Sequence, residues 1–174
     1  MQLKLNQKQE YCIDTSFIAR LFESFPRDTY KTLWDNLEEA EKDNWHIICE
    51  VEEELKKKFP DEHEWCKKQG IRVEEISDDA FMESRNAVRD FPEWIKLNTT
   101  DLYFADPFLV GHARVNKCVV VTAEKREPQD KKKKKDIKLP DVCDVYKIEC
   151  IGQRHGDLDI VPVNDFFARV GITA

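Results

Sequence analysis

Short apolar runs alternate with segments of helical spacing along most of the chain. The first run, "YCI" at positions 11–13, is followed by apolar residues at helical spacing from Thr15 to Glu23. A second run, "WHIIC" at 45–49, is followed by "EVEEELKKK", in which acids precede lysines as the helix dipole favours. Strands that alternate with helices in this way predict an α/β fold with a mainly parallel sheet.

The second half of the chain continues this alternation. "CVVVT" at 118–122 is an unbroken apolar and β-branched run, which indicates a strand in a sheet that helices cover on both faces. The stretch from Asp61 to Trp94 predicts helices and one strand near "IRVEEI", and the C-terminal "DIVPVNDFFARVGI" predicts a short strand and then a helix that begins near Asn164. We therefore expect one domain over residues 1–174, with a central sheet flanked by helices.

Composition narrows the class of protein. Of the 174 residues, 41% are hydrophobic and 36% are charged, no apolar run is long enough to span a bilayer, and the N-terminus lacks the apolar stretch of a secretory signal. We expect a soluble cytoplasmic protein with no membrane partner. The net charge of −7 argues against broad non-specific binding to nucleic acid, although residues 114–138 hold a local excess of basic side chains.

The six cysteines are interpreted as reduced core or surface residues. Cys12, Cys49 and Cys118 lie in apolar runs, where a cysteine serves as a small core residue. "HIIC" and "HEWC" have the spacing of metal ligands on a helix, but each lacks a second pair of ligands. The pattern therefore favours buried or surface cysteines over a zinc site.

Acidic residues are predicted where ligands bind in a parallel sheet, at the carboxyl ends of its strands. Asp14 ends the first predicted strand, and Glu124 comes just after "CVVVT". Asp106 precedes Pro107, a pair typical of a helix cap and the first helical position, so we expect Asp106 to cap the helix that leads into that strand. These three acids are therefore expected on one rim of the sheet.

A fourth acid is expected from the helix after "WHIIC". Glu50, Glu53 and Glu54 share one helix face near its start, and the pattern does not choose among them. A helix cap or a solvated loop explains each acid taken singly. Four acids on one rim repel one another unless a counter-ion is present, and oxygen ligands favour Mg²⁺ or Mn²⁺ over zinc.

The order of these motifs resembles that of the PIN-domain nucleases. The matching segments are, in chain order, "YCIDTSFIARLF", "EVEEEL", "ADPFLVGHA" and "VVVTAEK". The later "DIKLPDVC" and "DFFARVGI" are similar to a bacterial PIN subfamily close to the VapC-type toxins. The resemblance extends from Tyr11 to Ile172 and implies a PIN-like three-layer fold.

The resemblance also implies roles for individual residues. The four metal-binding and catalytic acids would be Asp14, Glu54, Asp106 and Glu124, with Glu50 and Glu53 as alternatives to Glu54. Glu124 departs from most of the family, which has Asp there, and its extra methylene moves the carboxylate outward. The implied supporting residues are Ser16, Thr122 and Asp141, although Asp141 also fits the cap of a short helix.

The function implied by the resemblance is Mg²⁺- or Mn²⁺-dependent hydrolysis of RNA, which leaves a 5′ phosphate and a 3′ hydroxyl. Such a protein is commonly the toxin of a toxin–antitoxin pair, so the implied partners are RNA, a cognate antitoxin and a second copy of the chain. The aromatic residues between Trp65 and Trp94 would supply a dimer interface or, equally, part of the core.

Other functions remain as alternatives. A PIN-like scaffold that binds RNA or protein without cleavage is the main one, but four intact acids argue against it. A dehalogenase-type phosphatase requires an acid at position 16, where this chain has serine. A receiver domain requires an acidic pair before Asp14, which the sequence lacks.

Basic residues after Glu124 are candidates for contacts with the RNA backbone. They are Lys125, Arg126, Lys131, Lys132, Lys133, Lys134 and Lys135. A solvated loop is the commoner explanation of such a charge run. This run nevertheless leaves the sheet beside the acidic rim, where it would hold phosphates without reading bases.

Overall fold

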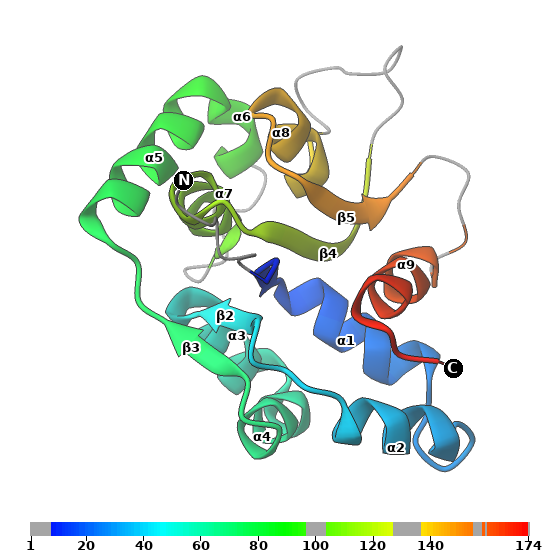
Figure 1. Ribbon diagram of the computed structural model, residues 1–174. Coiled ribbons are helices and arrows are strands. Elements are labelled where there is room, and N and C mark those ends of the chain that lie inside the picture. The colour runs from blue at the N-terminus through cyan, green and yellow to red at the C-terminus, as the bar shows by residue number, and fades with distance from the viewer. Residues whose placement is uncertain (1–7, 97–103, 127–136, 155–157, 159, 174) are drawn as a thin grey trace, which may run out of the picture.

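The computed structural model describes residues 8–96, 104–126, 137–154, 158 and 160–173, in which strands and helices alternate (Figure 1). The strands are β1 (Tyr11–Ile13), β2 (Trp45–Ile48), β3 (Arg72–Glu74), β4 (Val119–Lys125) and β5 (Cys150–Gln153). The helices are α1 (Thr15–Ser24), α2 (Lys31–Glu39), α3 (Cys49–Lys58), α4 (Pro60–Lys68), α5 (Asp78–Asp90), α6 (Pro92–Lys96), α7 (Asp106–Asn116), α8 (Leu139–Val145) and α9 (Val161–Val170). This alternation follows the predicted order of elements.

The described strands form one five-stranded sheet in the order β3-β2-β1-β4-β5, with every neighbouring pair parallel. The chain runs outward from β1 through β2 to β3 and then returns across the sheet to β4 and β5. The predicted α/β fold with a central parallel sheet is thereby confirmed. The direction of winding reverses between β1 and β4, and ligands of such sheets bind beside the carboxyl ends of the strands at this reversal.

Helices cover both faces of the sheet and give three layers. In Figure 1, α5, α6, α7 and α8 lie on one side, and α1, α2, α3, α4 and α9 lie on the other. The second face is aromatic: Phe166 of α9 packs edge-on against Tyr11 of β1 and Phe17 of α1. It also packs against Trp45 of β2, with ring centroids 4.8 Å apart. These contacts fix the central strands against α1 and α9.

On the opposite face, α5 and α7 pack closely at Gly111. A Cβ atom at this position would lie 2.2 Å from the carbonyl oxygen of Ala80 and 2.8 Å from the amide nitrogen of Ser84. Both atoms belong to the backbone of α5, so a larger residue would force the two helices apart. The glycine therefore lets α7 lie between α5 and the sheet.

Several predicted boundaries are wrong by a few residues. The last helix begins at Val161, near Pro162, rather than near Asn164, and Ile160 lies in a turn instead of the predicted short strand. Proline is favoured in the first turn of a helix because its N–H would have no partner there in any case.

Trp65 and Trp94 are buried, so both side chains belong to the core and not to an exposed interface.

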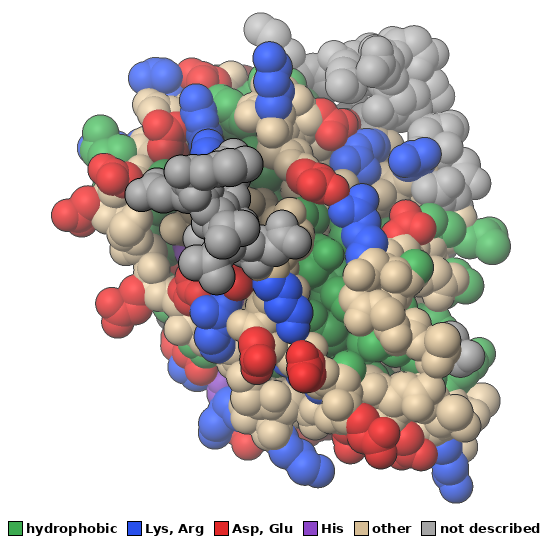
Figure 2. Space-filling view, in the orientation of Figure 1, with side chains coloured by type: hydrophobic (Ala, Val, Ile, Leu, Met, Phe, Trp, Pro, Cys, Tyr) green, Lys and Arg blue, Asp and Glu red, His purple; other side chains and the backbone are tan. Residues whose placement is uncertain are grey.

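The surface is mixed in charge. In Figure 2, acidic and basic side chains are interspersed over the face shown and form no large area of one sign. Within the described part of the chain, no helix has both the length and the apolar character needed to cross a membrane.

Candidate active site

Asp14 lies directly after β1, at the carboxyl end of the sheet. Its side chain is 3% exposed and makes no capping hydrogen bond to α1. Instead, its Oδ2 atom accepts hydrogen bonds from Ser16 Oγ at 2.5 Å and Thr122 Oγ1 at 2.8 Å. The two hydroxyls named in the sequence analysis thus contact this carboxylate and orient it, which a simple cap does not explain.

Glu54 is the acid of α3 that points toward Asp14. It is buried, and it accepts hydrogen bonds from Thr15 Oγ1 at 2.6 Å and from the Ala105 amide at 3.3 Å. Glu53 is exposed and pairs with Lys56 on the helix surface, with Oε1 and Nζ 2.7 Å apart. Glu50 accepts from the thiol of Cys49 in its own helix. Of the three glutamates, Glu54 is therefore the one whose carboxylate contacts the residues next to Asp14 and Asp106.

Asp106 and Glu124 complete the group, with two corrections to the predicted boundaries. Asp106 is the first residue of α7 and Ala105 holds the cap position, so the prediction that Asp106 caps this helix is wrong. Glu124 lies within β4 and not after it, because β4 continues past an irregularity after Val121 to pair Lys125 with Gln153. The Oε2 atom of Glu124 accepts a hydrogen bond from the Leu139 amide at 2.8 Å. We call Asp14, Glu54, Asp106 and Glu124 the carboxylate cluster.

Asp141 lies beside this cluster but has a local role. Its Oδ2 accepts from the Lys138 amide at 3.2 Å, as part of a capping box at the start of α8. Asp141 was expected either to support the site or to cap a short helix, and the structure shows the capping interaction. Two residues of the site were not predicted from the sequence: Thr15, which donates a hydrogen bond to Glu54, and Lys138, whose charge acts on Asp106 and Glu124. Thr15 could have been identified from the sequence, because it is a small polar residue directly after Asp14.

The carboxylates raise one another's proton affinity. Burial raises the pKa of Asp14, against the opposing effect of the Ser16 and Thr122 hydroxyls. Burial and then the charges of Glu124, Asp14 and Glu54 raise the pKa of Asp106 well above its usual value. Burial raises the pKa of Glu54 and of Glu124 as well, and the Asp14 charge adds to both. The four side chains therefore share one electrostatic site.

A divalent cation fits the donor chemistry of this site. Anionic oxygen atoms from four side chains are the ligands that Mg²⁺ and Mn²⁺ prefer, and a cation would offset their repulsion. The oxygen atoms do not converge on one point: in the described part of the chain, the compact group of ligand atoms is formed by cysteines and histidines elsewhere. The carboxylate cluster thus has the ligand chemistry that a hard cation prefers, but its oxygen atoms lie farther apart than the ligands of a bound ion.

The basic residues proposed to contact RNA differ in their surroundings. Lys125 is exposed at the end of β4. Arg126 is half-buried and engaged within the protein, since it pairs with Asp144 at 3.0 Å and donates to the carbonyl oxygens of Gly152 and Cys150. Residues 131–135, the five lysines, lie outside the described residues.

The raised pKa values predict how stability depends on pH when no divalent cation is present. A carboxyl whose folded pKa exceeds its unfolded value binds protons more strongly when folded. The free energy of unfolding should then fall as pH rises from about 4 through the raised folded values, by about 1.4 kcal/mol for each unit of difference. Urea unfolding in EDTA across this range would measure it.

An Asp106→Asn variant should show a flatter pH dependence, because it removes the carboxyl on which three other acids act. Asp35→Asn on the exposed surface of α2 should follow the wild type. Identical profiles for wild type and Asp106→Asn would contradict the electrostatic coupling.

Comparison with known proteins places most of the chain in one protein family. A family model described as a domain of unknown function (DUF4411) matches residues 11–155, which span β1 to β5 and all four members of the carboxylate cluster. A search of curated proteins finds none that matches the chain.

Proposed function

The chain belongs to the DUF4411 family of domains of unknown function, and we propose that it is a divalent-cation-dependent ribonuclease that acts through the carboxylate cluster. The observation that carries the proposal is that four acids beside the reversal of winding in a parallel sheet act on one another's pKa values. Asp14 follows β1, and Glu124 lies near the end of β4; these are the two strands on either side of the reversal. Asp14 and Glu54 are buried and Asp106 and Glu124 are half-buried, and acids rarely gather in such surroundings without a function that needs them.

The residues of the chain would divide the work as follows. Asp14, Glu54, Asp106 and Glu124 would hold Mg²⁺ or Mn²⁺, and Ser16 and Thr122 would keep Asp14 in its orientation. A bound divalent cation would supply Lewis-acid activation of the phosphate and stabilise the charge that develops on the leaving oxygen. Thr15 and the Ala105 amide would hold Glu54 by hydrogen bonds to its two oxygens. Lys138 would moderate the negative charge beside Asp106 and Glu124.

RNA as the substrate, a toxin role and an antitoxin partner rest on the resemblance to PIN-domain nucleases. The same is true of a homodimer. The lysines at 131–135 and the exposed Lys125 remain the predicted contacts with the phosphate backbone, in keeping with a substrate that is an extended polyanion.

The direct test is cleavage of a labelled single-stranded RNA by the purified protein, with EDTA, Mg²⁺ or Mn²⁺. We expect cleavage only with a divalent cation and products that end in a 3′ hydroxyl. Stable binding of RNA without any cleavage in all three conditions would instead favour the non-catalytic scaffold.

Substitution of the α3 glutamates should separate a role at the site from a general effect of charge. Glu54→Gln should reduce cleavage strongly, since the amide cannot supply an anionic ligand, yet it can still hydrogen-bond to Thr15 and the Ala105 amide. Glu53→Gln, one position away and exposed, should leave the rate near that of the wild type, and Glu50→Gln should have an intermediate or small effect. A larger loss in Glu50→Gln than in Glu54→Gln would show that the register is wrong by one helical turn.

A further inference from the structure

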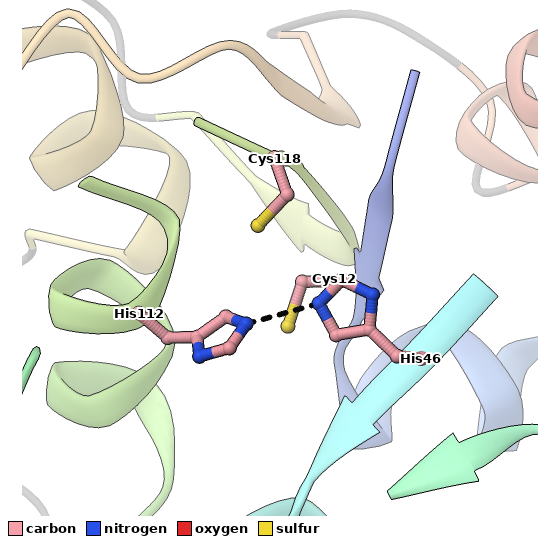
Figure 3. Close-up of side chains that lie close together, drawn as sticks. All are labelled: Cys12, His46, His112 and Cys118. Atoms are coloured by element: carbon pink, nitrogen blue, oxygen red, sulfur yellow. Dashed lines mark hydrogen bonds between the residues drawn. The ribbon is translucent and has the colours of Figure 1, made fainter. Parts of the chain in front are cut away.

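Two cysteines and two histidines meet beneath the helix α7, away from the carboxylate cluster. They are Cys12 of β1, His46 of β2, His112 of α7 and Cys118, just before β4, and we call them the Cys/His cluster. One ligand atom from each side chain lies within 4.8 Å of all the others. Figure 3 shows the four side chains directed toward a common point between the sheet and α7.

Strand register explains why these residues meet. Cys12 pairs with His46 across the parallel strands β1 and β2, so both side chains leave the same face of the sheet. Tyr11 pairs with Val119, which places Cys118 on the face opposite to Tyr11 and therefore on the face of Cys12. Tyr11 packs against α9, so the face of Cys12 is the one covered by α7. His112 reaches down from that helix.

All four side chains are buried, with exposed fractions of 3% or less. The Nε2 atoms of the two imidazoles face each other at 3.0 Å. Tetrahedral zinc with sulfur and nitrogen ligands requires separations between ligand atoms of roughly 3.3–3.8 Å, from metal–ligand bonds of about 2.0–2.3 Å. The ligand atoms lie within 4.8 Å of one another, so shifts of about 1 Å or less would bring the widest pairs into that range.

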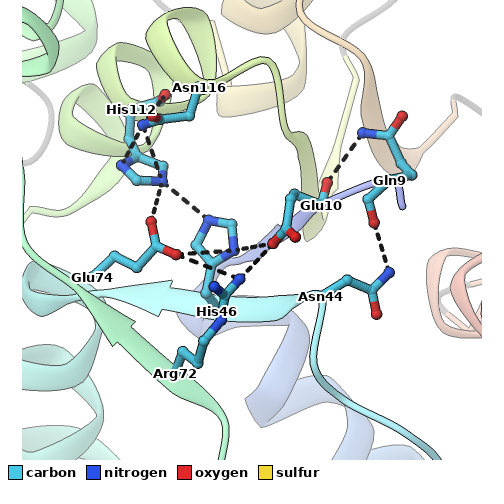
Figure 4. A network of polar contacts seen from close by, with 8 residues as sticks. All are labelled: Gln9, Glu10, Asn44, His46, Arg72, Glu74, His112 and Asn116. Carbon is cyan, nitrogen blue, oxygen red and sulfur yellow. Dashed lines mark hydrogen bonds and ion pairs between the residues drawn. The ribbon is translucent and has the colours of Figure 1, made fainter. Parts of the chain in front are cut away.

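The surroundings provide polar partners for the outer nitrogens of both rings (Figure 4). Nδ1 of His46 lies 3.6 Å from a carboxylate oxygen of Glu10, and it makes no hydrogen bond although it is buried. Nδ1 of His112 lies 3.1 Å from the side-chain amide of Asn116. Metal-bound histidines typically donate their other N–H to a carboxylate or an amide oxygen, which fixes the ring. Glu10 is such a partner for His46. Asn116 instead presents its donor nitrogen to His112, so a zinc-bound His112 requires the Asn116 amide to turn and present its oxygen.

We propose that Cys12, His46, His112 and Cys118 form a structural zinc site. Two sulfur and two nitrogen ligands in a tetrahedron select Zn²⁺ rather than the hard cations expected at the carboxylate cluster. Four protein ligands leave no open position, so the ion would hold the structure together and would not act on substrate. Glu74 of β3, whose Oε2 lies 3.4 Å from Nε2 of His112, places an anionic group at the solvent side of the site.

A hydrogen-bonded cluster without metal is the competing explanation. In it, Nε2 of one histidine must donate to Nε2 of the other, so one particular proton arrangement has to be maintained in a buried site. A zinc ion removes this requirement, because both Nε2 atoms then bind the metal and His46 can direct its Nδ1–H toward Glu10. His46 faces Glu10 with Nδ1–H in the metal-free arrangement too when His112 is the donor, so the metal content of the protein has to separate the two explanations.

Zinc would fix the position of α7 relative to the central strands. Cys12 and Asp14 are two residues apart at the end of β1, and His112 and Asp106 lie on the same helix. The ion would therefore tie together the elements that carry two of the four acids. This proposal does not depend on the reaction proposed for the carboxylate cluster.

The test is the metal content of full-length protein purified with reduced thiols and reconstituted with zinc. We expect one zinc ion per chain by elemental analysis, and replacement by Co²⁺ should give the absorption of tetrahedral cobalt with thiolate ligands. Cys118→Ser and His112→Gln should lose both signals. Cys66→Ser and His63→Gln are matched controls, because both residues are buried outside the cluster, and they should keep them. Asp14→Asn should also keep its zinc, which separates this site from the carboxylate cluster.

A milder variant covers the case in which loss of a ligand prevents folding. Glu10→Gln removes the carboxylate beside His46 and should weaken zinc affinity by about 10–100-fold in competition with a chromophoric chelator. Three results would overturn the proposal: reconstituted wild type that holds no zinc, cobalt absorption that persists in Cys118→Ser, or a disulfide between Cys12 and Cys118.

Discussion

Asp14→Asn should lower the rate of the proposed RNA cleavage by roughly 10²–10⁴-fold, because the substitution removes an anionic ligand of the catalytic cation. Such a cation contributes several kcal/mol to the stability of the transition state. The side chain keeps its shape, and its remaining oxygen can still accept from the hydroxyls of Ser16 and Thr122. The loss should therefore appear in the chemical step and not in the amount of folded protein. Single-turnover cleavage at saturating RNA and divalent cation measures it.

The same substitution should leave the cation-free protein as stable as the wild type, or slightly more stable. Burial raises the pKa of Asp14, so its ionised form is unfavourable in the folded state at neutral pH. Asparagine carries no charge and removes that cost. Asp35→Asn, on an exposed surface, serves as the control and should change neither rate nor stability. Cleavage by Asp14→Asn at the rate of the wild type would exclude the carboxylate cluster as the active site.

Phe166→Ala should lower the free energy of unfolding by about 3–5 kcal/mol, the usual cost of removing a fully buried phenylalanine. Phe166 has no exposed surface and packs against Tyr11, Phe17 and Trp45, with ring centroids 5.3, 5.2 and 4.8 Å away. Loss of this ring would leave a cavity that borders β1, β2 and α1. Urea unfolding followed by tryptophan fluorescence measures the change, because Trp45 borders the cavity.

Phe81→Ala is the matched control for this experiment. Phe81 is 47% exposed and stacks only loosely on Phe108, with ring centroids 6.3 Å apart, so the cost should be about 1 kcal/mol or less. Equal losses for the two variants would mean that α9 does not hold the sheet as described.

The local part of the candidate site could be predicted from the sequence. A short strand, an aspartate at its end and a helix that begins at Thr15 follow from neighbouring residues, and in the structure Asp14 comes directly after β1 and directly before α1. The choice of Glu54 required the rotation of α3 against α1, since Glu50 and Glu53 share the same approximate helix face in the sequence. The position of Glu124 depended on pairing between β4 and β5, a contact between distant segments that extends β4 beyond its apolar run.

The Cys/His cluster was not predicted from the sequence for a related reason. Its four ligands come from four elements, so their spacing in the chain resembles no metal-binding motif. Cys12 and Cys118 were correctly expected to be buried, whereas Cys49, also expected in the core, is half-buried. The common face of Cys12 and Cys118 depends on the register of β1 with β2 and β4. A signal was nevertheless present: His46 and His112 each interrupt an apolar segment, where a histidine needs a partner.

The order of the strands has a consequence for the synthesis of this protein. β1 is made first but pairs with β4, and the hydrogen bond from Thr122 to Asp14 joins residues 108 positions apart. Such distant contacts form late, because the intervening chain must be ordered before they are gained. A ribosome-bound chain that ends before β4 would lack Glu124 and Thr122, one of the two hydroxyls that orient Asp14. The proposed nuclease activity should therefore be absent from nascent chains until most of the protein has left the ribosome.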